Sequence, residues 1–255
     1  MIRVLLFLFS VFLVSGCTEN GPVIPPLGPQ ELGDRKVLVE EFTGVRCPNC
    51  PPGSAELESL TSLYGENLIM VSIHASGSFA IPLEDSKFDF RTTAGEQLRT
   101  YLGQPFGYPS AVINRKQLPG RSTLQLNQAA WASTIEEELQ ADPALAINLT
   151  TTYDANSRTL SANIILLPNQ TIEEPLHLSL MLTEDGIIDK QLTPDGKDDE
   201  YLHRHVLRTM LSRSDGDALP ELERGKALER NYSFVLPEDW QAQQCDIIAF
   251  VHQTG

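Results

Sequence analysis

The chain has 255 residues, of which 41% are hydrophobic and 21% are charged, values typical of a folded, soluble protein. Its formal net charge is −15 at pH 7, so nucleic acid and anionic lipid surfaces are poor partners for it. A chain of this length forms one large domain or two of ordinary size, and a change of pattern near the middle favours two.

The first segment resembles a bacterial lipoprotein leader. Arg3 precedes the apolar run Val4–Val14, and small residues lead directly to Cys17. The run is too short for a bilayer span of about 20 apolar residues, and the small residues suit cleavage. The resemblance to a lipobox implies a signal peptide over residues 1–16 and diacylglyceryl on Cys17, with an ordinary secretory leader as the alternative. Both predict export, and residues 17–35 are expected to form an extended tether to the membrane.

A Cys-x-x-Cys motif follows this tether. Residues 37–39 predict a short buried strand and residues 54–64 an amphipathic helix, so Cys47 and Cys50 are expected at a helix N-terminus. There, unpaired backbone N–H groups and the positive end of the helix dipole stabilise a thiolate, the species that attacks a disulfide. The context favours dithiol chemistry.

Metal binding is the main competing use of such a motif. A closed structural zinc site needs four ligands, and the sequence has no second cysteine pair. His74 has no partner at ligand spacing and is expected to be packed or hydrogen-bonded. The acidic segment 195–200 does not match a calcium loop and is expected to be a solvated loop, while His203 and His205, on one side if the segment is a strand, lack a third ligand. We expect no metal and no cofactor.

The rest of the first half continues to alternate strands and helices. Residues 68–76 predict a second strand, and the strand–helix–strand order predicts a right-handed βαβ unit with parallel strands. A short helix is expected over 95–102, a strand led by Pro109, and a helix over 127–140. Proline is tolerated at the start of a strand, and its bond here is a candidate for the cis form.

This order resembles the thioredoxin-like superfamily over residues 36–141. The resemblance implies that Cys47 attacks, that Cys50 resolves, and that Pro109 lies beside the pair and helps to bind an extended partner. It also implies that Glu41, six residues before the first cysteine, accepts the proton of the resolving thiol. The alternative for Glu41 is a solvated carboxylate at the strand end, because Glu40 beside it points to the opposite face and either could be the inward one.

Two features depart from the superfamily pattern. Arg46 stands where thioredoxins often have an aromatic residue, and its charge either favours a thiolate at Cys47 or is merely solvated. The intervening Pro48-Asn49 also differs from the dipeptides of well-known reductases and oxidants. The reduction potential is therefore left open by the sequence.

The second half predicts strands. Segments 146–153 and 159–166 alternate apolar and polar residues around a polar turn and predict a hairpin. Strands over 176–183, 232–236 and 246–252 complete a mainly antiparallel, immunoglobulin-like β-sandwich. The expected fold is an α/β thioredoxin-like domain at 36–143 followed by a β-sandwich domain at 144–255. Cys245 is expected to be a small buried hydrophobe; the alternative, a resolving thiol, requires another cysteine Cα within about 7 Å.

Several motifs together are similar to the Omp28-related lipoproteins of Bacteroidetes. They are the lipobox, residues 39–44 before the cysteine motif, residues 201–208, residues 231–234 and the terminal strand around Cys245. The resemblance implies a thioredoxin-like domain, a β-rich second domain and an outer-membrane location, on the periplasmic face or at the cell surface. It does not supply a substrate.

Two functions follow from these patterns. The first is a membrane-tethered thiol–disulfide oxidoreductase, in which Cys47 forms a mixed disulfide with a cysteine-containing envelope or surface protein, Cys50 resolves it and Pro109 positions the partner backbone. The second is a surface binding or adhesion lipoprotein whose Cys47–Cys50 disulfide is only structural. The motif and the topology jointly favour the first.

Overall fold

The structure, a computed structural model, describes residues 34–75 and 77–253. The predicted signal peptide, the lipid site at Cys17 and nearly all of the predicted tether lie outside these residues. The described residues belong to one compact unit. Over these residues, none of the helices has the length and hydrophobicity needed to cross a membrane.

The first half alternates strands and helices, as its pattern predicts. Pro51 and Pro52 occupy the first turn of its longest helix, where the missing N–H groups lose no helical bond. The first two strands pair in parallel, from Val37↔Leu68 to Phe42↔Ile73, as a βαβ unit requires. The elements are β1 (Val37–Phe42), α1 (Cys50–Tyr64), the 3₁₀ turn η1 (Gly65–Asn67), β2 (Leu68–Ile73), α2 (Thr93–Tyr101), β3 (Ser110–Ile113), η2 (Gln128–Ala130) and α3 (Trp131–Leu139).

The second half is mainly antiparallel and rich in strands, which confirms the coarse prediction. The expected hairpin is present as the first two of these strands, paired from Leu145↔Pro168 to Asp154↔Thr159. The elements are β4 (Leu145–Asp154), β5 (Thr159–Pro168), β6 (Leu176–Glu184), β7 (Ile187–Thr193), β8 (Gly196–His203), β9 (Val206–Met210), β10 (Asp217–Ala218), β11 (Leu228–Val235), η3 (Ala242–Gln244) and β12 (Cys245–Gln253). The expectation of a loop at 195–200 is wrong, because these exposed residues form part of the β7–β8 turn and the first part of β8.

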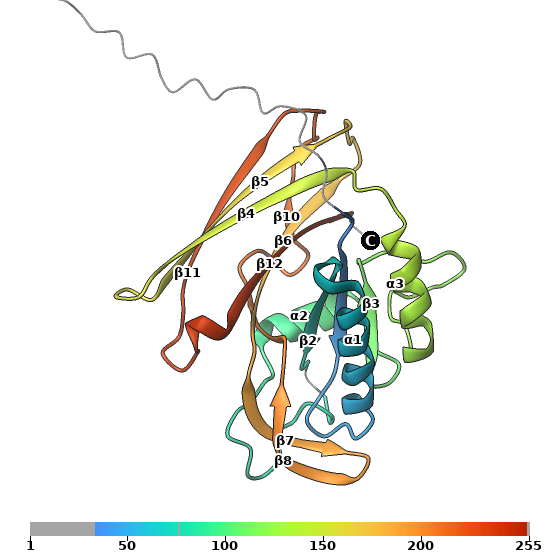
Figure 1. Cartoon of the computed structure of the whole chain (residues 1–255), viewed down its shortest axis with the longest axis vertical. Helices are drawn as coiled ribbons and strands as arrows, with labels where there is room; N and C mark the ends of the chain where they lie inside the picture. The colour runs from blue at the N-terminus through green and yellow to red at the C-terminus, as the bar shows by residue number, and fades with distance from the viewer. Residues whose placement is uncertain (1–33, 76, 254–255) are drawn as a thin grey trace, which may run out of the picture. The chain divides into compact units, whose positions relative to one another are not determined.

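Within the described residues, the strands form three sheets (Figure 1). The main sheet has the order β10-β6-β9-β2-β1-β3, with β12 along the other edge of β6. A smaller sheet has the order β11-β5-β4, and β7 and β8 form a two-stranded sheet. Because β2 joins β9 in parallel at Ser72↔Val206, the main sheet crosses the boundary predicted between residues 143 and 144. The two predicted domains therefore share one sheet.

Side chains along β1 alternate between two apolar layers. One layer lies under α1 and α3 and includes Val37, Val39, Leu57, Trp131 and Ile135. The layer on the opposite face includes Leu38, Phe42, Leu98, Met181 and Leu207, and α2 covers it. Period-two alternation thus directs odd-numbered residues of β1 toward α1 and even-numbered ones toward α2. A third apolar layer packs β5 of the smaller sheet against β6.

Candidate functional site

A disulfide joins Cys47 to Cys50 where the chain passes from β1 into α1, with the two Cα atoms 5.4 Å apart. Cys50 is the first residue of α1, so the pair lies at the positive end of the helix dipole, as the sequence predicts. The loop is held by backbone bonds from the Cys47 N–H to Gly44 O (3.0 Å) and from the Cys50 N–H to Cys47 O (3.2 Å). These two bonds are local, but distant backbone also holds the loop, since the Arg46 N–H donates to Phe79 O (2.8 Å).

Both cysteines are buried, each with only 1% of its surface exposed, although Pro48 and Asn49 between them are exposed. The residue preceding Cys47, Arg46, binds a neighbouring loop. Its guanidinium donates from Nε to Ile81 O (2.8 Å) and from Nη2 to Pro82 O (2.6 Å). Arg46 is therefore bonded to backbone carbonyls rather than merely solvated.

Glu41 is completely buried on the α1 side of β1. The Ser54 hydroxyl donates to its carboxyl group, with both oxygens 3.0 Å away, and Ser54 lies one helical turn after Cys50. Removal from water raises the Glu41 pKa from 4.5 to about 8, against the lowering effect of the Ser54 bond and with a further rise from the Glu58 charge. The alternative of a solvated carboxylate is wrong, and Glu41 is mainly protonated at pH 7.

Glu40 is equally buried but serves the packing of the sheet. On the α2 side, its carboxylate accepts from Arg115 Nε (2.9 Å) and Nη2 (2.8 Å), and neither side chain is more than 1% exposed. Arg115 Nη1 also donates to Ser179 Oγ (3.3 Å) and Ser214 O (3.2 Å), and the guanidinium lies over the Phe250 ring. The ion pair thus connects β1 to β6 and β12.

Pro109 lies against the beginning of α1. A Cβ atom added to Gly53 would approach Pro109 Cγ to 2.7 Å, and Gly53 follows Cys50 by three residues. The Tyr108–Pro109 bond is cis, which the sequence had marked as a candidate. The structure therefore brings Pro109, Glu41 and the cysteine pair to the first two turns of one helix.

A cavity of about 540 Å³ opens beside this helix, between α1, β2 and residues 201–205. His74 and His203 line it, both buried, with ring centroids 5.9 Å apart. Burial, the largest cause, lowers the His74 pKa to about 3 and the His203 pKa to about 4, so both imidazoles are neutral at pH 7. His74 Nδ1 and His203 Nε2 have no hydrogen-bond partner among the described residues.

His203 and His205 do not lie on one side of a single strand. His203 is the last residue of β8, whereas His205 follows it with a left-handed backbone (φ 52°) and approaches Glu58, with Nε2 3.5 Å from Oε1. Among residues 34–75 and 77–253, no three His, Cys, Asp or Glu side chains are placed to hold a metal ion together.

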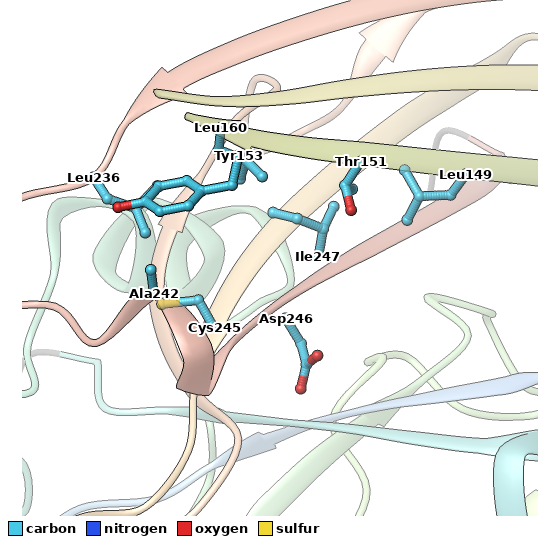
Figure 2. A pocket seen from close by; sticks show the side chains of 9 residues that line it. All are labelled: Leu149, Thr151, Tyr153, Leu160, Leu236, Ala242, Cys245, Asp246 and Ile247. Atoms are coloured by element: carbon cyan, nitrogen blue, oxygen red, sulfur yellow. The ribbon is translucent and has the colours of Figure 1, made fainter. Parts of the chain in front are cut away.

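Cys245 is a free, partly exposed thiol at the start of β12. Figure 2 shows its sulfur beside Ala242, in a pocket of about 310 Å³ that also includes Tyr153 and Leu160 from the β4–β5 hairpin. Burial is the main cause that raises the Cys245 pKa to about 11, and the Glu184 charge adds to it. Cys47 pairs with Cys50, so Cys245 is not the partner of either in this structure.

Sequence reasoning missed the residues of β7 that hydrogen-bond to the cysteine loop. The Gln191 side chain donates from Nε2 to Cys47 O (3.1 Å) and Gly44 O (3.2 Å), and the Leu192 N–H donates to Val45 O (2.8 Å). These residues are about 145 positions along the chain from the loop they hold, so no local signal could have found them. Ser54 was accessible to reasoning, because position i+4 places it on the Cys50 face of the helix.

The fold and the site define an α/β protein that carries a buried disulfide at a helix start and continues into a β-rich half. The family model for outer membrane protein Omp28 matches residues 96–255, and the chain belongs to this family. The predicted family is thereby confirmed, and membership supports a location in the outer membrane or cell envelope. The matched residues include Pro109 but begin after the two cysteines.

Two solved structures resemble the chain. HBP35 of Porphyromonas gingivalis superposes with a TM-score of 0.65 at 22% sequence identity, covering 86% of this chain and 69% of that one; this likeness concerns the fold. A protein of Agrobacterium tumefaciens has a TM-score of 0.45 and 13% identity, with 85% and 95% of the two chains covered. A search of curated proteins found no match.

Proposed function

We propose that this chain is an exported, lipid-anchored outer-membrane protein whose thioredoxin-like half exchanges the Cys47–Cys50 disulfide with thiols of envelope or surface proteins. The observation that carries this proposal is the position of Glu41. It is a fully buried carboxyl group with a pKa of about 8, held by Ser54 one turn after Cys50. Burial of a carboxyl group without a counter-charge opposes folding, and a titratable group near neutrality suits proton transfer.

The exchange begins from the disulfide that the structure contains. A partner thiolate attacks Cys47 Sγ, the Cys47–Cys50 bond breaks, and Cys50 leaves with the electron pair. Glu41 supplies the proton that neutralises the Cys50 thiolate. A second partner thiolate then attacks the partner sulfur of the mixed disulfide and releases Cys47 as a thiolate, which the dipole of α1 stabilises.

The overall change transfers two electrons from the partner dithiol to the Cys47–Cys50 pair, and Glu41 regains its proton from water. In reverse, the Cys47 thiolate attacks a partner disulfide and the Glu41 carboxylate accepts the Cys50 proton. Pro109, packed on the first turn of α1, lies where it can align the partner backbone. Lipid on Cys17 would hold this chemistry at the membrane.

Trapping of partners tests the exchange. Cys50→Ser in a Cys245→Ser background should accumulate disulfide-linked partners through Cys47 in native cells, seen as bands that disappear on reduction. Cys47→Ser in the same background is the matched control and should trap none. A Cys50→Ser chain that traps nothing more than this control would contradict the proposal.

Labelling with a radioactive fatty acid tests the anchor, and Cys17→Ser should abolish the label.

A second candidate is a binding lipoprotein whose disulfide is only structural. The specific observation in its favour is that each cysteine is only 1% exposed. A reduction potential below about −300 mV, as structural disulfides have, together with no trapped partners, favours this candidate. A potential in the range of about −270 to −120 mV favours exchange.

A further inference from the structure

The β7–β8 hairpin lies over the cysteine loop but belongs to neither large sheet. Among the described residues its strands pair only with each other, and Figure 1 shows it near the N-terminal end of α1. Its buried side chains pack apart from the main layers: Ile187 joins Val45, Phe90 and Val206, and the His203 ring lies with its centroid 4.6 Å from that of Phe90. Such an element can separate from the body without unfolding the main sheet.

A short set of hydrogen bonds fastens the hairpin to the cysteine loop. Gln191, 3% exposed, donates to Cys47 O and Gly44 O, and the Leu192 N–H donates to Val45 O. The pairing of β7 with β8 shifts between Asp189 and Gln191. Irregularities of this kind redirect side chains, and here the Gln191 amide reaches the disulfide loop.

A second attachment lies next to the first. The Asp189 carboxylate, 1% exposed, accepts from the backbone N–H groups of Lys87 (3.0 Å) and Phe88 (2.8 Å). Beyond it, Lys197 approaches Asp85 at 3.3 Å in a more exposed ion pair, which adds little. The buried polar bonds of Gln191 and Asp189 therefore fasten the hairpin together with the packing of Ile187 and His203.

We propose that the β7–β8 hairpin is a lid that must open before any thiol reaches the Cys47–Cys50 disulfide, and that Gln191 is its latch. The inference rests on the proposed exchange function for its biological meaning, but its physical content is independent of it. Exchange requires a thiolate to reach a sulfur atom, and both cysteines are buried in the closed state. Gln191 is a positioning residue, because it acts by holding the loop closed.

The test is the rate at which dithiothreitol reduces the disulfide in the purified folded protein. A dithiothreitol thiolate attacks one cysteine sulfur, the other cysteine leaves as a thiolate and takes a proton from water, and the second thiol closes the reagent into a cyclic disulfide. Two electrons pass to the protein. Maleimide labelling at timed intervals, counted by mass spectrometry, gives the rate without any partner protein. Labelling of Cys245 is removed by using a Cys245→Ser background throughout.

Gln191→Ala should accelerate reduction about tenfold or more, because it removes the amide bonds that keep the lid closed. Gln125→Ala is the matched control. Gln125 is also a buried amide, donating to Gly103 O (3.0 Å) and accepting from Ser110 (2.7 Å), but it makes no hydrogen bond to the hairpin or the cysteine loop among the described residues. It should lower the global stability to a similar degree and leave the reduction rate within about twofold of the parent.

Asp189→Ala supplies a second lid variant in case Gln191→Ala folds poorly, and it should also accelerate reduction. Equal rates for the lid variants and the parent would overturn the proposal. So would equal acceleration by Gln125→Ala, since the disulfide would then be reached through global unfolding. Failure of partner trapping alongside faster reduction of the lid variants would refute the exchange function and leave the lid intact.

Discussion

Glu41→Gln is expected to stabilise the protein in a strongly pH-dependent way. Glutamine keeps the shape of the protonated acid and an oxygen that can accept from Ser54, but it has no charge to bury. The Glu41 pKa is raised to about 8 mainly by desolvation, whereas an unfolded chain titrates near 4.5. Between these values the folded protein holds a proton that the unfolded chain has lost, so its free energy of unfolding falls as pH rises.

The size of the effect follows from the pKa shift. One pKa unit corresponds to about 1.4 kcal/mol, so ionisation of Glu41 removes up to about 5 kcal/mol of stability between pH 4.5 and pH 8 or above. Glu41→Gln should therefore match the parent at pH 4.5 and exceed it by about 3 kcal/mol at pH 7. At pH 8.5 the advantage should approach its full value.

Urea unfolding of the oxidised protein at intervals from pH 4.5 to pH 8.5 measures this difference. Glu136→Gln, on the exposed side of α3, is the control and should follow the parent at every pH. Parallel curves for Glu41→Gln and the parent would show that Glu41 is not buried in a protonated state. The stabilised variant should nevertheless exchange more slowly with partners at pH 7, because it cannot donate a proton to Cys50.

Three further substitutions test the packing and the ion pair around the site. Arg115→Met leaves the Glu40 carboxylate buried without a counter-charge and should lower the free energy of unfolding by about 3–5 kcal/mol, measured in urea, whereas Arg115→Met with Glu40→Leu should recover most of it. Gly44→Ala places a Cβ atom 2.4 Å from Phe79 O and should cost about 1–3 kcal/mol; an unchanged melting temperature would contradict this close approach. Trp131→Ala leaves a cavity in the apolar layer under α1 and α3 and should lower the free energy of unfolding by about 3–5 kcal/mol in the same urea assay.

The local sequence pattern was sufficient to predict those elements whose structure depends on residues close together in the chain. The start of α1 follows from Pro51 and Pro52 and from apolar residues at helical spacing, so the position of Cys50 could be predicted. The β4–β5 hairpin follows from alternation around a polar turn. These elements are set by periodicity and turn chemistry, which the sequence displays directly.

The sequence could not predict the features that depend on contacts between segments far apart in the chain. Alternation showed that Glu40 and Glu41 face opposite ways, but it could not show that both faces of β1 are covered. The β7–β8 hairpin was missed because half of β8 is charged and most of it is exposed, which resembles a solvated loop. The target of Gln191 depends on contacts across 144 positions, which periodicity does not report.

The shared main sheet has a consequence for how the chain is made. The two cysteines are three positions apart, so their bond can form as soon as that stretch leaves the translocation channel. The layer that contains Leu38 and Phe42, however, is completed only by Met181, Leu207 and Ile248. For the exported chain proposed above we expect the disulfide to form before this layer is complete, since contacts of such long sequence separation form slowly. A chain stopped after residue 143 would expose the edge of β2 and is expected to aggregate.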